Sequence, residues 1–222
     1  MPAPRQPATP AIVFSNGRRT RKKIALTFDA CATRKLAGFD RRIIRILQET
    51  KTPATLFLGG KWMLDFPDET RRLAYDSLFE LGSHSFLHPH MKTLTNDSIR
   101  KDLQLTQDIM FSLTGRQSTL FRPPYGEYDE RIVQLAAELG MTTVMYDLAS
   151  GDPDSTITND QLVTYVSQCA RKGSIIVMHM NGRGWHTAKA LPEIITSLKR
   201  RGFQFVTVGS LMMNESERGD DL

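Results

Sequence analysis

Short β-rich runs alternate along this chain with longer segments that have the hydrophobic period of a helix. The expected strands are 24–28, 54–58, 78–84, 119–121, 142–146, 174–178 and 203–208. The expected helices are 38–50, 66–76, 95–115, 128–140, 157–173 and 186–202. Strands that alternate with helices form parallel β/α units. The chain is therefore an α/β protein, built either as an open doubly wound sheet or as a β/α barrel.

Polar side chains follow the expected strands at the point where each strand ends. The residues at these ends are Asp29, His84, Arg122, Asp147 and His179. In a barrel, the C-terminal ends of all strands surround one mouth, where β/α enzymes carry their catalytic residues. An open sheet would instead place its site at a single switch point. The spread of polar residues over several strand ends favours a barrel.

The length and charge of the chain indicate one folded domain with charged ends. Its 222 residues suffice for one core, and its net charge of +5 comes from basic residues that precede the first acidic one. We therefore expect a flexible basic arm over 1–21, a barrel domain over 22–208 and an acidic tail over 209–222, without a nucleic-acid-binding face. No run approaches the apolar length of a membrane span. The N-terminus could be the mature end of a chain whose leader was removed.

Three of the five histidines fall within the seven residues of HSFLHPH, at the end of an expected strand. His84 and His88 are four residues apart, with His90 two further on. This spacing lets two imidazoles converge on one cation if the segment turns after the strand. Surface or capping histidines are the alternative, but the clustering at a strand end favours a metal site.

Two further loops carry groups suited to catalysis. The prolines of RPPYG at 122–126 restrict its backbone, so this loop can aim N–H groups or hold an arginine against a carboxylate. It could also be a turn without a function. Asp147, Asp152 and Asp154 follow one expected strand, and His179 ends another. A carboxylate, a histidine pair, an arginine and a separate histidine are the set that metal-assisted hydrolysis requires.

The order and the residues of these motifs resemble those of the polysaccharide deacetylases of carbohydrate esterase family 4. The matching segments are TFDA at 27–30, HSFLH at 84–88, RPPYG at 122–126, YDLASGDP at 146–153 and VMH at 177–179. The resemblance extends over about residues 22–208. It implies a single-domain, distorted β/α barrel of seven or eight strands, in agreement with the strand-end argument.

The resemblance also implies catalytic roles for residues at matching motif positions. Asp29 would be the catalytic base, held in place by Arg122. Asp152 would orient His179 as the general acid, and the backbone N–H of Tyr125 would help to stabilise the oxyanion.

In the same way, the resemblance implies that His84 and His88 bind a divalent metal, with zinc as first choice and cobalt or nickel as alternatives. Val177 would line the acetyl pocket. We expect Pro123 and Trp185 to contribute to the substrate pocket as well, because an indole ring can stack on a sugar.

Two positions depart from the family pattern. Pro153 replaces the aromatic residue that usually follows Asp152, and Ala30 stands where the family has its metal-binding aspartate. Two neutral imidazoles alone make a weak metal site. Asp40 is the first candidate for the missing ligand, although it could equally be a helix N-cap. Cys31, as a thiolate, is the second.

The sequence therefore predicts a metal-dependent N-deacetylase that acts on N-acetylglucosamine-containing glycans, either chitin oligomers or peptidoglycan. An amidohydrolase of small non-sugar amides is one alternative. A catalytically silent carbohydrate-binding protein, marked by Ala30, is the other. A glycan is the expected partner, and this substrate class implies a cell-envelope or secreted location, the periplasm included.

Overall fold

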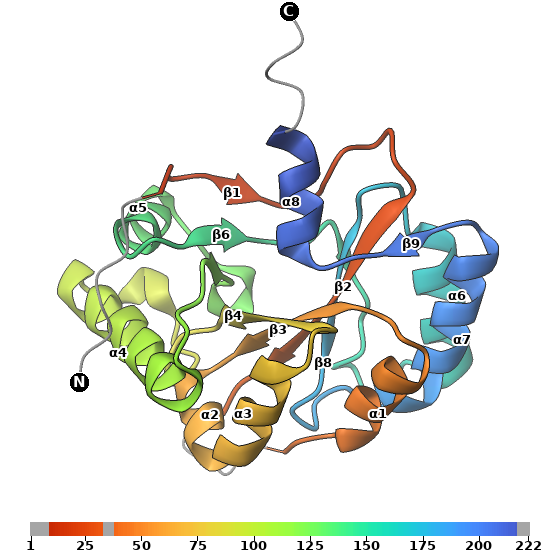
Figure 1. The fold of residues 1–222 in the computed structure, drawn as a ribbon, viewed down its shortest axis with the longest axis horizontal. Helices are drawn as coiled ribbons and strands as arrows, with labels where there is room; N and C mark the ends of the chain where they lie inside the picture. The colour runs from red at the N-terminus through yellow and green to blue at the C-terminus, as the bar shows by residue number, and fades with distance from the viewer. Residues whose placement is uncertain (1–8, 33–37, 217–222) are drawn as a thin grey trace, which may run out of the picture.

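The computed structural model describes residues 9–32 and 38–216 and contains a curled sheet at its centre (Figure 1). Every pairing between its strands is parallel. The main path contains, in spatial order, β1 (Val13–Phe14), β6 (Thr142–Val144), β5 (Leu120–Phe121), β4 (Phe79–Ser83), β3 (Ala54–Leu58), β2 (Lys23–Ala30), β8 (Ile175–His179) and β7 (Leu148–Ala149). Strand β9 (Gln204–Phe205) pairs with the start of β2 outside this path.

The path of the sheet returns toward its own beginning. Residues 145–147 connect β6 directly to β7, while β6 pairs with β5 and β7 pairs with β8. One short stretch of chain thus joins both halves of the sheet, which forms a distorted barrel. The predicted barrel of seven or eight strands is confirmed in this form, with eight strands on the main path.

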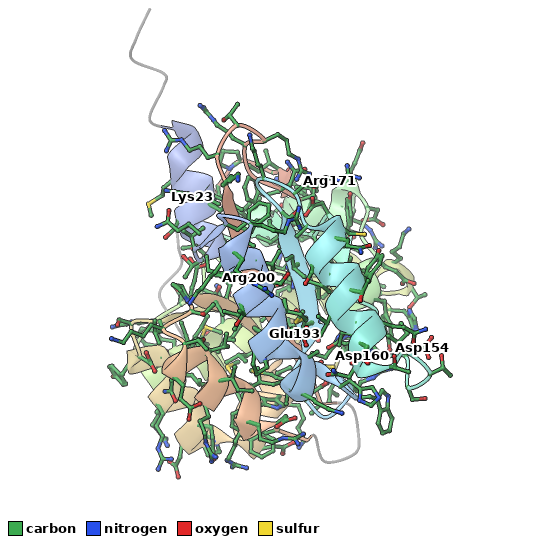
Figure 2. All side chains as sticks on the ribbon, turned by 90° about the vertical axis from the view of Figure 1, so that its right-hand side faces the viewer. Lys23, Asp154, Asp160, Arg171, Glu193 and Arg200 are labelled. Carbon is green, nitrogen blue, oxygen red and sulfur yellow. The ribbon has the colours of Figure 1, made fainter. Side chains whose placement is uncertain are left out.

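Helices surround the sheet on its outer side (Figure 1). They are α1 (Arg41–Glu49), α2 (Gly60–Asp65), α3 (Pro67–Tyr75), α4 (Asn96–Thr114), α5 (Glu130–Glu138), α6 (Asn159–Cys169) and α7 (Thr187–Arg200), with single 3₁₀ turns at Met91–Thr93 and Pro124–Gly126. Helix α8 (Val208–Ser216) instead packs against the cluster on the inner side of the sheet. Figure 2 shows the face formed by α6 and α7, on which Asp160, Glu193 and Arg200 are exposed. The opposite side of α7 buries Leu191 and Ile194, as a period of 3.6 residues requires.

The side chains of β2 alternate between two environments. Its even-numbered residues Ile24, Leu26, Phe28 and Ala30 belong to the large hydrophobic cluster between the sheet and its helices. The side chain of Asp29 points to the opposite face of the sheet and lines a pocket inside the barrel mouth. Because successive strand residues point to opposite faces, Ala30 is a core residue here.

Two ordered segments fall within the predicted N-terminal arm and the predicted C-terminal tail. Strand β1 lies inside the predicted arm, because Phe14 is buried in an inner cluster and pairs with β6. Helix α8 extends past the predicted boundary at 208, and its Leu211 packs into the same cluster. The arm residues 1–8 and the tail residues 217–222 lie outside the described part of the chain. Within that part, no helix is long and apolar enough to cross a membrane.

Candidate active site

A pocket of about 270 Å³ opens at the C-terminal ends of the strands. Its walls come from β2, β8 and the loops that follow β4, β5 and β7. The predicted site residues that line it are Asp29, His84, His88, Arg122, Pro123, Tyr125, Asp152, Val177 and His179. These residues come from distant parts of the sequence, and the barrel brings them into one cavity.

Asp29 and Arg122 form a buried ion pair at one side of the pocket. Nη1 of Arg122 lies 2.8 Å from Oδ1 of Asp29 and also donates to the hydroxyl of Thr27 at 2.7 Å. Burial alone would raise the pKa of Asp29, but the charge of Arg122 holds that pKa below its usual value. Asp29 is therefore ionised at neutral pH and able to accept a proton.

Asp152 and His179 form a second oriented pair. Oδ1 of Asp152 lies 2.8 Å from Nδ1 of His179, and Oδ2 accepts from the backbone N–H of His179 at 2.7 Å. The hydroxyls of Ser150 and Thr187 also donate to this carboxylate. Burial lowers the pKa of His179, but the hydrogen bond and charge of Asp152 outweigh it and raise that pKa. With Nδ1 occupied, Nε2 is the nitrogen left to exchange a proton with a substrate.

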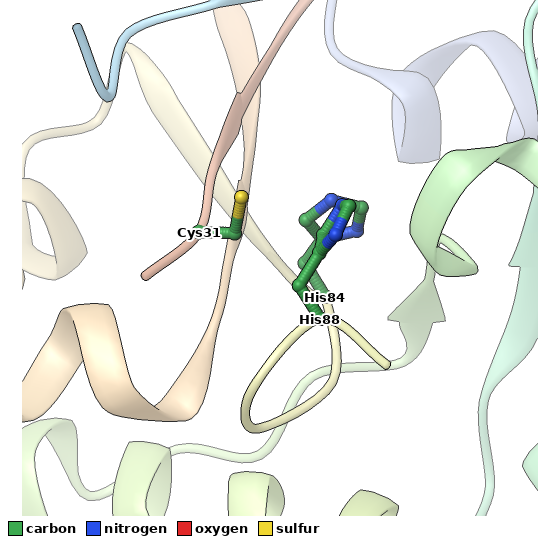
Figure 3. A group of neighbouring side chains, drawn as sticks. All are labelled: Cys31, His84 and His88. Carbon is green, nitrogen blue, oxygen red and sulfur yellow. The ribbon is translucent and has the colours of Figure 1, made fainter. Parts of the chain in front are cut away.

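His84, His88 and Cys31 form a group suited to a metal (Figure 3). One potential ligand atom of each lies within 4.8 Å of the other two. Nδ1 of His84 is 2.8 Å from the carbonyl oxygen of Arg122, which leaves Nε2 for a cation. Nδ1 of His88 is buried without a hydrogen-bond partner. Burial lowers the pKa of both imidazoles, to about 3 for His88, so both are neutral, as metal ligation requires.

The structure places the predicted metal ligand Asp40 at the start of a helix and outside the pocket. Asp40 is the N-cap of α1, where its carboxylate accepts from the N–H of Arg42 at 3.1 Å and pairs with the Arg42 guanidinium at 2.7 Å. It does not line the pocket. Its alternative role as a helix cap is the one observed.

Two other expected residues also lie away from the pocket lining. Trp185 is 60% exposed and is absent from the pocket wall, although its N–H donates to the carbonyl of Asp152. Asp147 accepts from the N–H of Ile175 at 2.8 Å and pairs with Arg19 at 2.7 Å, so its carboxylate serves the contact between β7, β8 and the N-terminal segment.

Tyr125 is held in a left-handed backbone conformation, with φ of 58°. A left-handed tyrosine is strained, and such residues are concentrated at functional sites. Its ring contacts the His88 ring edge-on at 4.3 Å between centroids and stacks on the His90 ring at 4.0 Å. His90 is in turn 3.1 Å from Glu127. His90 thus supports the Tyr125 loop and is separate from the Cys31, His84 and His88 group.

A sequence model of the polysaccharide deacetylase family matches residues 16–144, which is more than half of the chain. The chain belongs to the polysaccharide deacetylase family. The peptidoglycan-N-acetylmuramic acid deacetylase PdaA of Bacillus subtilis is 29% identical over 92% of this chain and 77% of its own length. The peptidoglycan-N-acetylglucosamine deacetylase of Bacillus cereus is 30% identical over 94% of this chain and 74% of its own.

Solved structures of family 4 carbohydrate esterases share the fold of this deacetylase family member. Bacillus subtilis PdaA superposes with a TM-score of 0.82 at 27% identity, covering 93% of this chain and 87% of that one. A family 4 pseudoenzyme from Bacillus anthracis gives a TM-score of 0.82 at 28% identity, covering 92% and 70%.

The sequence did not indicate two residues that line the pocket, or one that supports it from behind Cys31. Arg183 and Tyr146 line the cavity, and Asn181 donates to the sulfur of Cys31 at 3.2 Å. Asn181 and Arg183 belong to the Gly-rich loop after His179. A loop without periodicity gives no signal for the direction of its side chains, which the packing of the barrel mouth determines.

Proposed function

We propose that this chain is a metal-dependent hydrolase that removes N-acetyl groups from N-acetylglucosamine-containing glycans, peptidoglycan or chitin oligomers. The observation that carries this proposal is the pairing of Asp29 with Arg122 and of Asp152 with His179 in one pocket. An ionised base and an oriented acid are the two groups that amide hydrolysis requires. Such glycans lie outside the cytoplasm, so we propose a cell-envelope, periplasmic or secreted location.

The chain's own residues can carry each proton transfer of this reaction. Asp29 would take a proton from the water that attacks the acetyl carbon, while Arg122 keeps the carboxylate in position. The new C–O bond produces a tetrahedral oxyanion, toward which the N–H of Tyr125 would donate. His179 would then give its Nε2 proton to the nitrogen as the C–N bond breaks, which yields acetate and a free amine.

His84 and His88 would hold the metal, which we propose to be zinc, cobalt or nickel. Its positive charge, when bound, would lower the pKa of the attacking water and polarise the acetyl carbonyl. Val177 and Pro123 contribute apolar surface to the pocket beside these groups. They would accept the methyl group of the acetamide.

A catalytically silent carbohydrate-binding protein is the second candidate. Ala30 in place of a metal-binding aspartate and the similarity to a Bacillus anthracis pseudoenzyme favour it. The retained pairs of Asp29 with Arg122 and Asp152 with His179 argue against it, because binding alone needs neither a base nor an acid.

Acetate release from N-acetylglucosamine oligomers and from peptidoglycan tests the proposal. The parent chain should release acetate, and Asp29→Asn should lower kcat by about 10²–10⁴-fold because it removes the base. Asp68→Asn is the matched control, since its side chain is 76% exposed on α3. Release from small amides alone would instead support an amidohydrolase. Glycan binding without acetate release would support the silent protein.

A further inference from the structure

We propose that Cys31 is the third protein ligand of the metal, as a thiolate, and that it makes the site selective for thiophilic metals such as zinc and cobalt over magnesium and manganese. The inference rests on the proposed function only in that both place a metal at His84 and His88. It assigns to Cys31 the part that a carboxylate plays in the family pattern.

The alternation of side chains along β2 places Ala30 and Cys31 on opposite faces of the sheet. Ala30 is fully buried in the cluster between the sheet and its helices. Cys31 is the next residue, so its side chain points to the same face as Asp29, and both residues line the pocket. Of positions 30 and 31, it is therefore position 31 that can deliver a ligand to the pocket in this chain.

The two histidines offer nitrogen atoms for a cation. Nδ1 of His88 is buried without a hydrogen-bond partner, and the contact at Nδ1 of His84 leaves its Nε2, which lies 3.7 Å from Oδ2 of Asp29, available to a cation. Zinc bonds of roughly 2.3 Å to sulfur and 2.0–2.1 Å to nitrogen place the donor atoms of a tetrahedral site about 3.5 Å apart. The candidate donor atoms of Cys31, His84 and His88 lie within 4.8 Å of one another, so side-chain adjustments are enough to close the site.

A thiolate also restores the charge that the substitution of aspartate by Ala30 removes. Two neutral imidazoles leave both charges of a divalent cation uncompensated, whereas a thiolate supplies one negative charge, as a carboxylate would. Asn181 positions the sulfur, because its Nδ2 lies 3.2 Å from Sγ and 3.0 Å from the carbonyl oxygen of Cys31. This outer contact is of the kind that orients metal ligands. Thiolate donors favour zinc over magnesium and manganese, which prefer oxygen ligands.

Cobalt(II) titration tests the inference, because a thiolate bound to cobalt gives a charge-transfer absorption band that imidazoles do not. We expect this band at one equivalent of cobalt in the parent chain and in Cys169→Ser. Cys169 is the matched control, since it is a free, exposed cysteine at the end of α6. Cys31→Ser should lack the band and bind cobalt at least about 10–100-fold more weakly. Loss of a group that only supports a metal ligand already lowers affinity by about this factor.

The outcomes separate this inference from the proposed function. A band without acetate release would support Cys31 as a ligand and contradict the deacetylase. Acetate release with bound cobalt but no band, or a band that persists in Cys31→Ser, would overturn the role of Cys31, as would failure of the parent chain to bind cobalt. The variant Cys31→Ala, which removes the sulfur without adding a polar group, controls for misfolding when it is compared with the parent by circular dichroism. It should keep the parent spectrum and lack the band, and a band that persists in it would overturn the role of Cys31.

Discussion

Arg122 is the residue that connects Asp29, the proposed catalytic base, to the interior of the barrel. Its side chain is 1% exposed, and its guanidinium lies 4.0 Å from the centre of the Phe57 ring while it pairs with Asp29. Removing one partner of such a buried pair leaves the other charge without compensation, which typically costs about 3–5 kcal/mol. The position of the Asp29 carboxylate therefore depends on the packing of the core.

The Asp152–His179 pair predicts a specific pH dependence. Asp152 raises the pKa of His179 against the effect of burial, so protonated His179 persists to higher pH than an ordinary histidine. A general acid must be protonated, and kcat/KM should therefore fall as pH rises through this raised pKa. Asp152→Asn removes the charge, so the alkaline limb of the profile should move to lower pH, and kcat should fall by about 10²–10⁴-fold.

The matched control for this prediction is Asp154→Asn, which is exposed in the same loop and whose carboxylate accepts hydrogen bonds from the N–H and hydroxyl of Thr156. A pH–rate profile of kcat/KM for each variant gives the comparison. An alkaline limb that stays at the same pH in Asp152→Asn would contradict the assignment of His179 as the acid.

At the level of elements, helix α4 supports the loop that carries the histidine pair. Oδ1 of Asp102 on α4 accepts from the N–H of Phe86 at 2.9 Å, and the N–H of Leu87 also bonds to this carboxylate. Burial raises the pKa of Asp102 to about 6, so it is ionised at neutral pH and above. The loop needs this support because His88 adopts φ of 55°, which a non-glycine residue rarely takes.

Asp102→Ala should therefore weaken metal binding although Asp102 is not itself a ligand. The loss of an outer support typically lowers metal affinity by about 10–100-fold, and zinc affinity measured by chelator competition gives the value. Asp97→Ala on the same helix is the control, because its side chain is 85% exposed. Equal zinc affinity in both variants would show that α4 does not position the loop.

The elements also show how far the sequence could predict this structure. Long periodic segments such as 95–115 correspond to real helices, because a repeated apolar face must be buried. Strands β1 and β7 have two residues each, too few for a period to appear. The ordered motifs predicted side chains that line one pocket, namely Asp29, His84, His88, Asp152 and His179. The local sequence allows Asp40 to be a cap or a ligand, and only the folded chain, which places it as the N-cap of α1 outside the pocket, separates the two.

At the scale of the whole molecule, the N-terminal segment joins two parts of the barrel. Strand β1 pairs with β6, and three residues further on the N–H of Gly17 donates to the carbonyl of Gly173, just before β8. The N–H of Gly173 donates in turn to Lys23 at the start of β2. Residues 14–23 therefore connect strands that are distant along the path of the sheet.

Gly173→Ala should disrupt this junction. A Cβ atom there would lie 2.2 Å from the carbonyl oxygen of Gly17, and φ of 76° already disfavours a side chain. Gly115→Ala is the control, because its φ of 70° is similar but no atom lies within 4 Å. The left-handed backbone costs both variants about 1–2 kcal/mol, and the clash should cost Gly173→Ala about 1–3 kcal/mol more.

Thermal unfolding measures the difference, since about 1 kcal/mol corresponds to about 2–4 °C in a chain of this size. Gly173→Ala should therefore unfold at least about 2 °C below Gly115→Ala. Equal midpoints would show that the contact between Gly17 and Gly173 is not a closely packed junction.

Acetate release measured against added metal is the most direct test of the central claim that this pocket performs metal-dependent deacetylation. The chain would be stripped by a chelator and titrated with zinc or cobalt, with N-acetylglucosamine oligomers or peptidoglycan as substrate. We predict no release from the stripped chain, a linear rise up to one metal per chain, and a plateau beyond it. Release that survives complete removal of metal would contradict the account, as would its absence at every metal concentration.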